Sequence, residues 1–143
     1  MAAEVIPGIV DVELVRQNYL SAQLYLSDHR ETILVEGRGP GVCGAANCPA
    51  YVLEKRGQSC RLLLDAEEVQ QVHVLNSVTN GYHDIQTDMH GSATLSDLFI
   101  YRYDGRQYRL KECLSREYTL DVDEKGEARS SAKPMITHMA CRR

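Results

Sequence analysis

The chain has 143 residues, of which 43% are hydrophobic and 25% are charged, so it suits one soluble globular domain and is unlike a disordered segment. The net charge is -4 and no long basic stripe is present, which excludes the usual signature of a nucleic-acid-binding protein. No apolar run approaches the roughly 20 residues of a membrane-spanning helix, so no membrane span is predicted.

The pattern of apolar residues predicts short strands along most of the chain. Segment 12–26 fits either a short helix or an extended arm that leads into a strand at Ser21–Leu26. Further strands are predicted where apolar and β-branched residues cluster or alternate between turn residues. These strands cover residues 32–35, 51–53, 59–64, 69–75, 82–89, 95–103 and 107–110.

Strong turn signals separate the later strands. Asn80-Gly81 and Asp104-Gly105 are typical of tight hairpin turns, because such turns need residues that tolerate a positive φ. Residues 115–120 are predicted to form one last strand. The polar stretch 121–133 is predicted to be a flexible loop or tail.

These elements predict an all-β fold. Seven or eight short, mainly antiparallel strands joined by hairpins would form a sandwich, a barrel or a strongly curved sheet. A single domain is expected over residues 1–143. A β-rich α+β fold with a short N-terminal helix is the alternative.

The five cysteines are too few for a disulfide scaffold and more than a typical cytosolic domain needs. Cys43 and Cys48 lie in a Gly/Ala loop, where a local disulfide is favoured over free buried thiols or half of a zinc site. No second ligand pair accompanies them, so no metal is predicted. Cys60 and Cys113 lie on predicted strands and are candidates for a second disulfide, which leaves Cys141 unpaired.

One predicted strand carries a polar face. Asp84, Asp88 and His90 are separated by even numbers of residues, so they share one face of an extended strand. One interpretation is an acid–base or metal cluster of a hydrolase. The favoured interpretation is a solvated face opposite the core, with Asp84 accepting hydrogen bonds from its turn. No catalytic residue and no cofactor is therefore assigned.

The hairpin around Asp104-Gly105 is the predicted binding site. Tyrosines and arginines alternate along it, and both residue types are favoured anchors of protein interfaces. The alternative is that the tyrosines close the edge of the core while the arginines are solvated. The candidate binding residues are Tyr101, Arg102, Tyr103, Arg106 and Tyr108.

Four motifs carry a resemblance to a known group of proteins. They are the Cys43–Pro49 loop (CGAANCP), Asn80–Ile85 (NGYHDI), His90–Ala93 (HGSA) and Tyr101–Tyr108 (YRYDGRQY). Together they resemble small exported bacterial proteins that share CGxxNCP, NGYxD, HGSA-like and YRxDGxxY patterns. The turn-to-strand units also resemble single blades of the FG-GAP and VCBS repeat families.

The resemblance implies a β fold and an exported address, and it transfers no catalytic residue. Calcium-binding blades carry a DxDxDG loop, whereas the turns at 27–30 and 79–82 lack enough oxygen ligands for calcium. Met1–Glu4 has neither the basic start nor the apolar stretch of a secretory signal, so the signal is expected to lie outside this chain.

The sequence thus predicts a non-enzymatic exported binding protein, periplasmic or secreted, with a cytoplasmic location as the alternative. An inhibitor or immunity protein that acts on a protein partner in the cell envelope is the class that best fits a small acidic domain without a catalytic constellation. A hydrolase that uses the Asp84, Asp88 and His90 face, and a structural module of an envelope assembly, are the rival hypotheses. The oligomeric state is left open.

Overall fold

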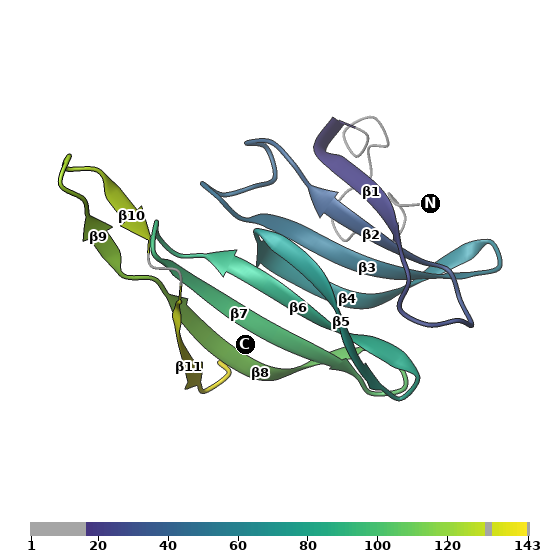
Figure 1. The fold of residues 1–143 in the computed structure, drawn as a ribbon. Coiled ribbons are helices and arrows are strands. Elements are labelled where there is room, and N and C mark those ends of the chain that lie inside the picture. The colour runs from purple at the N-terminus through teal and green to yellow at the C-terminus, as the bar shows by residue number, and fades with distance from the viewer. Residues whose placement is uncertain (1–16, 131–132, 143) are drawn as a thin grey trace.

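Antiparallel strands make up most of the computed structural model, which describes residues 17–130 and 133–142 (Figure 1). The first sheet has the order β1-β2-β3-β4 and the second has the order β11-β8-β7-β6-β5, while β9 and β10 pair only with each other. The strands are β1 Tyr19–Leu24, β2 Thr32–Gly37, β3 Cys48–Arg56, β4 Ser59–Val69, β5 Gln71–Thr79, β6 Tyr82–His90, β7 Leu95–Tyr103, β8 Tyr108–Glu117, β9 Leu120–Val122, β10 Ala128–Ser130 and β11 Met135–Met139.

The all-β prediction is confirmed, with eleven strands in the described ranges where seven or eight were expected. Helical conformation is confined there to Gln17 and Asn18, and residues 12–16 of the ambiguous N-terminal segment lie outside the description. Most of the additional strands lie near the C-terminus. Residues 115–120 are the end of β8 and the start of β9, and the polar stretch that follows contains the β9–β10 pair. Strand β11 was not predicted. Its five residues are all exposed, so the segment lacks the alternation of buried and exposed positions that marks a strand.

The two large sheets pack through a shared core. Strand β4 of the first sheet runs through Gln70 into β5 of the second, so the sheets are joined along this side (Figure 1). The core side chains come mainly from β2 to β8, where the pleat turns alternate residues inward except at the neighbours Leu63 and Leu64 of β4. The core contains Leu26, Leu34, Ala50, Val52, Leu63, Leu64, Ala66, Val69, Tyr82, Ile85, Phe99, Tyr101, Tyr103, Tyr108 and Cys113.

Buried residues also line the other side of the first sheet. Val35 and Leu53 form a second cluster, and Ile33, Tyr51 and Cys60 pack against it. These positions are offset by one from core residues such as Leu34 and Val52, so their side chains point to the opposite face. The first sheet is therefore apolar on both faces, unlike the alternation expected of a sheet with one solvated side.

A buried carboxylate stands at the junction of the two sheets. Glu54 on β3 is fully buried, and Tyr82 on β6 donates its hydroxyl to Oε2 at 2.5 Å. On the other carboxyl oxygen, Oε1, Arg56 donates through Nε at 3.0 Å, and the Arg30 guanidinium lies at 3.7 Å. Burial, together with the hydrogen bond to Glu54, raises the pKa of Tyr82 to about 12. One oxygen of the Glu54 carboxylate thus lies beside the arginine charges, and the other accepts a hydrogen bond from the neutral phenol of Tyr82.

Two hairpin motifs stabilise each other across the second sheet. Asn80 and Gly81 both have a positive φ, as a type I′ turn requires, and the Asn80 side chain donates to the Tyr103 carbonyl at 2.8 Å. Tyr108 in turn donates its hydroxyl to the His83 carbonyl at 2.7 Å. The NGYxD and YRxDGxxY motifs therefore meet in one structural unit.

The Cys43–Pro49 loop and the His90–Ala93 turn are also in contact with each other. The Asn47 side chain donates to the His90 carbonyl at 3.0 Å, and its own oxygen accepts the His90 backbone N–H at 2.8 Å. The two bonds mimic one step of a β-ladder and connect the first sheet to the end of β6. This contact gives both motifs a role in joining the two sheets.

Asn47→Ala is expected to lower the free energy of unfolding by about 1–3 kcal/mol, because it leaves the part-buried backbone groups of His90 unpaired. Equilibrium denaturation in urea measures the change. Asn76→Ala, at an exposed position of β5, is the matched control and should change stability little. An equal effect of the two substitutions would contradict the assignment.

Candidate binding site

A groove runs beside the Asp104-Gly105 turn, between the two sheets. Two adjoining cavities of about 340 and 240 Å³ form it, and they share Leu62, Gln107 and Arg109 as lining residues. One wall comes from β4 and the other from the first half of β8. We call this feature the hairpin groove.

The groove exists because two strand edges face each other without pairing. Strand β4 is the last strand of its sheet. Strand β11 covers β8 only from Cys113 to Glu117, so residues 108–112 of β8 have no partner on that side within the described ranges. An open edge presents backbone N–H and C=O groups that are able to pair with another chain. The groove therefore offers backbone as well as side-chain contacts.

The turn end of the groove is basic. Arg61, Arg106 and Arg109 line the smaller cavity, and Asp104 is the one carboxylate among its lining residues. Arg109 is paired with Asp104 at 2.9 Å, whereas Arg61 and Arg106 make no ion pair with the part of the chain that the structure describes. Positive charge thus remains available at this end for an anionic group.

Asp104 itself is committed to its turn. Its Oδ1 accepts the backbone N–H groups of Gln107 at 2.9 Å and Arg106 at 2.8 Å. The bond from Gln107 is the main reason that the pKa of Asp104 lies well below its usual range, with Arg109 and Arg106 adding to it. The carboxylate is therefore ionised, and it holds both Arg106 and Arg109 in place.

The tyrosines of the predicted site are mostly core residues. Tyr101, Tyr103 and Tyr108 are each no more than 6% exposed. The ring centroids of Tyr103 and Tyr108 lie 5.6 Å apart, and burial raises the pKa of Tyr108. Tyr101 and Tyr108 still line the floor of the larger cavity. Their bodies stabilise the core, and their accessible parts belong to the groove.

The two arginines of the predicted site lie on different sides of the sheet. Arg106 lines the groove, but Arg102 pairs with Glu112 at 2.5 Å and lies 3.7 Å from Asp84 on the opposite face. The structure therefore brings three of the five predicted residues, Tyr101, Arg106 and Tyr108, to one groove. A role of these five residues in binding stays a prediction.

The sequence reasoning missed the wall that β4 supplies. Arg61 and Leu62 line the groove opposite the hairpin, although they are far from it along the chain. No local pattern marks them, because they face the hairpin only once β4 and β8 have been placed beside each other. The approach of these two strands is a tertiary property.

The carboxylates of the alternative site share one face, but each has its own partners. Asp84 accepts hydrogen bonds from the hydroxyls of Ser77 at 2.7 Å and Thr79 at 2.8 Å. Asp88 accepts one from Gln86 at 2.8 Å and lies 3.4 Å from the Arg116 guanidinium. Within residues 17–130 and 133–142, no group of three or more His, Cys, Asp or Glu side chains is placed to hold a metal ion. The hydrolase hypothesis stays a prediction.

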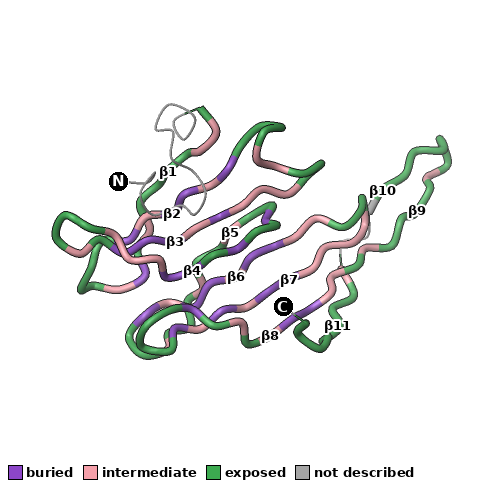
Figure 2. The backbone as a smooth tube through the Cα atoms, turned by 180° about the vertical axis from the view of Figure 1, so that it is seen from behind, coloured by how far each residue is buried: buried purple, intermediate pink, exposed green. Residues whose placement is uncertain are grey.

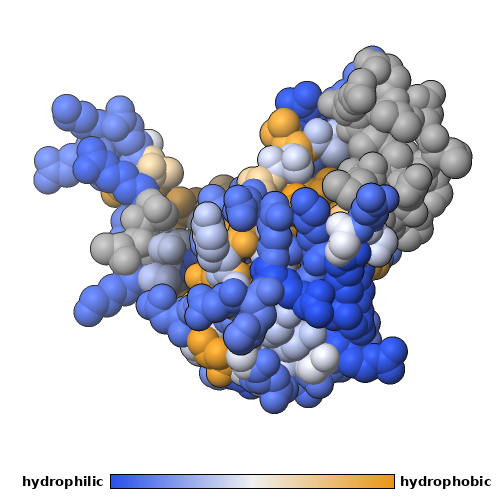
Figure 3. Space-filling view, turned by 90° about the vertical axis from the view of Figure 1, so that its right-hand side faces the viewer, coloured by the Kyte–Doolittle hydropathy of each residue, from blue (hydrophilic) through white to orange (hydrophobic). Residues whose placement is uncertain are grey.

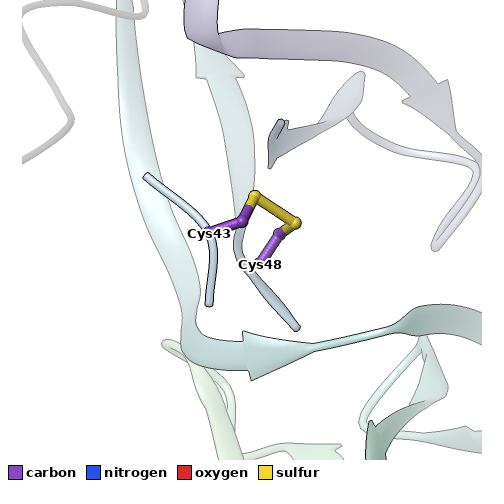
Figure 4. The surroundings of a disulfide bond; sticks show 2 residues. All are labelled: Cys43 and Cys48. Carbon is purple, nitrogen blue, oxygen red and sulfur yellow. A yellow bond between two sulfur atoms is a disulfide. The ribbon is translucent and has the colours of Figure 1, made fainter. Parts of the chain in front are cut away.

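The local disulfide is confirmed. Cys43 and Cys48 are bonded, with their Cα atoms 4.3 Å apart, and close the loop that carries Asn47 (Figure 4). Because the bond spans a short loop, it restricts the conformations from which Asn47 must reach His90. The disulfide therefore supports the contact between the two sheets.

The expected pairing of Cys60 with Cys113 is wrong, as is the expectation that Cys141 is left over. Cys113 is bonded to Cys141, and Cys60 is a free thiol. Cys60 packs against the outer cluster of the first sheet, whereas Cys113 points into the shared core, so the two thiols lie on different faces. Strand β11 places Met139 opposite Cys113 and thereby brings Cys141 within reach.

Comparison of the chain with protein-family models, with curated proteins and with solved structures found no match. None of the helical residues that the structure describes forms a segment long and apolar enough to cross a membrane. Two intramolecular disulfides are typical of proteins in oxidising compartments, such as the periplasm or the extracellular space. The groove and the disulfides are therefore the features of the molecule that bear on its function.

Proposed function

We propose that the protein is a non-enzymatic exported binding protein that holds an acidic segment of a protein partner in the hairpin groove. The observation that carries the proposal is the convergence of Arg61, Arg106 and Arg109 on one cavity whose lining contains a single carboxylate. Arginine recognises carboxylates through paired hydrogen bonds, which favours Asp or Glu side chains as the bound groups.

The open strand edges support an extended segment as the bound element. A strand that enters the groove would find unpaired backbone on β4 or on residues 108–112 of β8. Such strand addition supplies affinity through the main chain, while side-chain pockets supply specificity. The apolar groups of Leu62, Leu64 and Tyr108 would then contact alternate side chains of the segment.

The disulfides and the rigid turn support an inhibitor or immunity protein of the cell envelope. A blocking protein gains affinity when its binding surface is already ordered before the partner arrives. Asp104 orders the turn through two backbone hydrogen bonds, and it aligns Arg109 through the ion pair. The disulfides support a compartment in which thiols are oxidised.

The test compares capture of envelope proteins by wild type and by Arg106→Glu. We expect the charge reversal to lower affinity for a specific partner about tenfold or more, because attraction becomes repulsion at the turn. Binding should also weaken as salt is added, since the contact is exposed to solvent. Circular dichroism and urea denaturation should show an unchanged fold, because the Arg106 side chain makes no ion pair within the described residues.

Arg129→Glu is the matched control, since this arginine on β10 is 74% exposed and does not line the groove. A partner that binds wild type and Arg129→Glu but not Arg106→Glu supports the proposal. Equal binding to all three proteins rules out the groove as the binding site. Arg102→Glu is not a suitable test, because it would place a third carboxylate beside Asp84 and Glu112 and destabilise the sheet.

A further inference from the structure

A second cavity lies on the inner face of the second sheet, at the end where β11 joins it. Its volume is about 430 Å³, within the range of small-molecule sites, and it shares no lining residue with the hairpin groove. Its walls come from five strands, β4, β6, β7, β8 and β11, and from the residues that follow β11. We call it the C-terminal cavity.

The sheet register explains the floor of this cavity. Met139 of β11 lies opposite Cys113 of β8, and Cys113 lies opposite Phe99 of β7. In the next row, Met89 of β6 lies opposite Asp97 of β7. Residues that face each other in this way project from the same side of a sheet. Apolar groups therefore form a continuous floor beside one carboxylate.

The Cys113–Cys141 disulfide builds one wall. Cys113 is 3% exposed and points into the inner side of the sheet, so its bond to Cys141 holds the segment after β11 over that side. Ala140 and Arg142, the neighbours of Cys141, both line the cavity. The wall thus depends on a covalent bond, because all five residues of β11 are exposed.

The floor and the mouth of the cavity have different chemistry. Met89, Met139 and Phe99 supply a soft apolar surface, and methionine adapts readily to apolar ligands of different shapes. Glu68 and Asp97 add two carboxylates against the single cation of Arg142, and none of the three forms an ion pair with described residues. The lining therefore favours a ligand that is apolar along its body and positively charged at one end.

We infer that the C-terminal cavity binds a small molecule with an apolar body and a single ammonium group. The apolar body lies over Met89, Phe99 and Met139, and the ammonium group lies near Glu68 and Asp97. This site is independent of the proposed partner-binding groove, since the two have no residue in common.

Methyl NMR of the methionine residues tests the inference, with hexylammonium as the probe and hexanol and hexanoate as uncharged and anionic controls. We expect the resonances of Met89 and Met139 to shift with saturation on addition of hexylammonium. Met135 lies on the same strand as Met139 but outside the cavity, so its resonance should stay unchanged. Hexanol should bind more weakly, and hexanoate weakest of all.

The double variant Glu68→Gln/Asp97→Asn separates the charge effect from the fold. It should lower the affinity for hexylammonium about fivefold or more while leaving the affinity for hexanol unchanged. The variant Cys141→Ser should weaken both, because it frees the wall formed by Ala140 and Arg142. Unsaturated or equal shifts of Met89, Met135 and Met139, or equal affinity for hexylammonium and hexanoate, would overturn the inference.

Discussion

Cys141→Ser is expected to lower the free energy of unfolding by about 3.5 kcal/mol, the value that loop-closure entropy assigns to a bond across 28 residues. The enclosed segment contains β9, β10 and β11, whose residues are largely exposed (Figure 2). On the face that Figure 3 shows, hydrophilic groups cover the projection at the upper left, and hydrophobic groups are exposed at its base. Since little apolar surface holds this segment, the covalent bond has a large share in its stability.

Denaturation in urea under non-reducing conditions measures this effect. Cys48→Ser is the internal comparison, because its bond spans only 5 residues and is expected to contribute about 2 kcal/mol. Cys60→Ser removes a free thiol and should change stability least. Hydrogen exchange should show faster exchange of the β11 amides in Cys141→Ser alone. A larger loss for Cys48→Ser than for Cys141→Ser would contradict the expectation.

Glu54→Ala is expected to destabilise the fold by about 3 kcal/mol, because it leaves the Tyr82 hydroxyl buried without its acceptor and opens a cavity at a fully buried position. The carboxylate is fully buried, whereas Arg30 and Arg56 are 45% and 38% exposed and remain hydrated without it. The loss therefore comes mainly from the phenol and from the cavity that the shorter side chain creates. Urea denaturation measures it.

Glu54→Gln separates charge from shape. The amide oxygen still accepts a hydrogen bond from Tyr82, so we expect a smaller loss of stability than for alanine. It should also bring the pKa of Tyr82 down from about 12, since the Glu54 hydrogen bond and charge both raise this pKa. A titration followed by tyrosinate absorbance detects the change. An unchanged Tyr82 pKa would show that burial alone causes the shift.

The direction of the pH dependence follows from the raised pKa. Tyr82 is neutral below its ordinary pKa of 10.0 in both the folded and the unfolded chain. Its contribution to stability is fully present there and is lost as the pH rises from about 10 towards 12, where the unfolded chain ionises first. Glu54→Gln should therefore show a weaker loss of stability over this alkaline range than wild type.

Local patterns were enough to predict the strands between β2 and β8 and the turns between them. Asn80, Gly81 and Gly105 adopt the positive φ values that their residue types favour. The Cys43–Cys48 bond was predictable for the same reason, since its partners lie within one loop. The four motifs could be identified in the sequence. The contacts that Asn47 and Asn80 make between these motifs could not be predicted from it.

What the sequence determined by itself is the all-β class, because an alternating pattern and its turns act over a few residues and need no distant partner. Only the tertiary structure decided the rest. The pairing of β11 with β8 brings Cys141 close to Cys113, so the disulfide joins these two residues and not Cys60 and Cys113. The approach of β4 to β8 creates the hairpin groove. Each of these features joins residues that are far apart along the chain. Their contact depends on the summed packing of two sheets, which no local window of sequence contains.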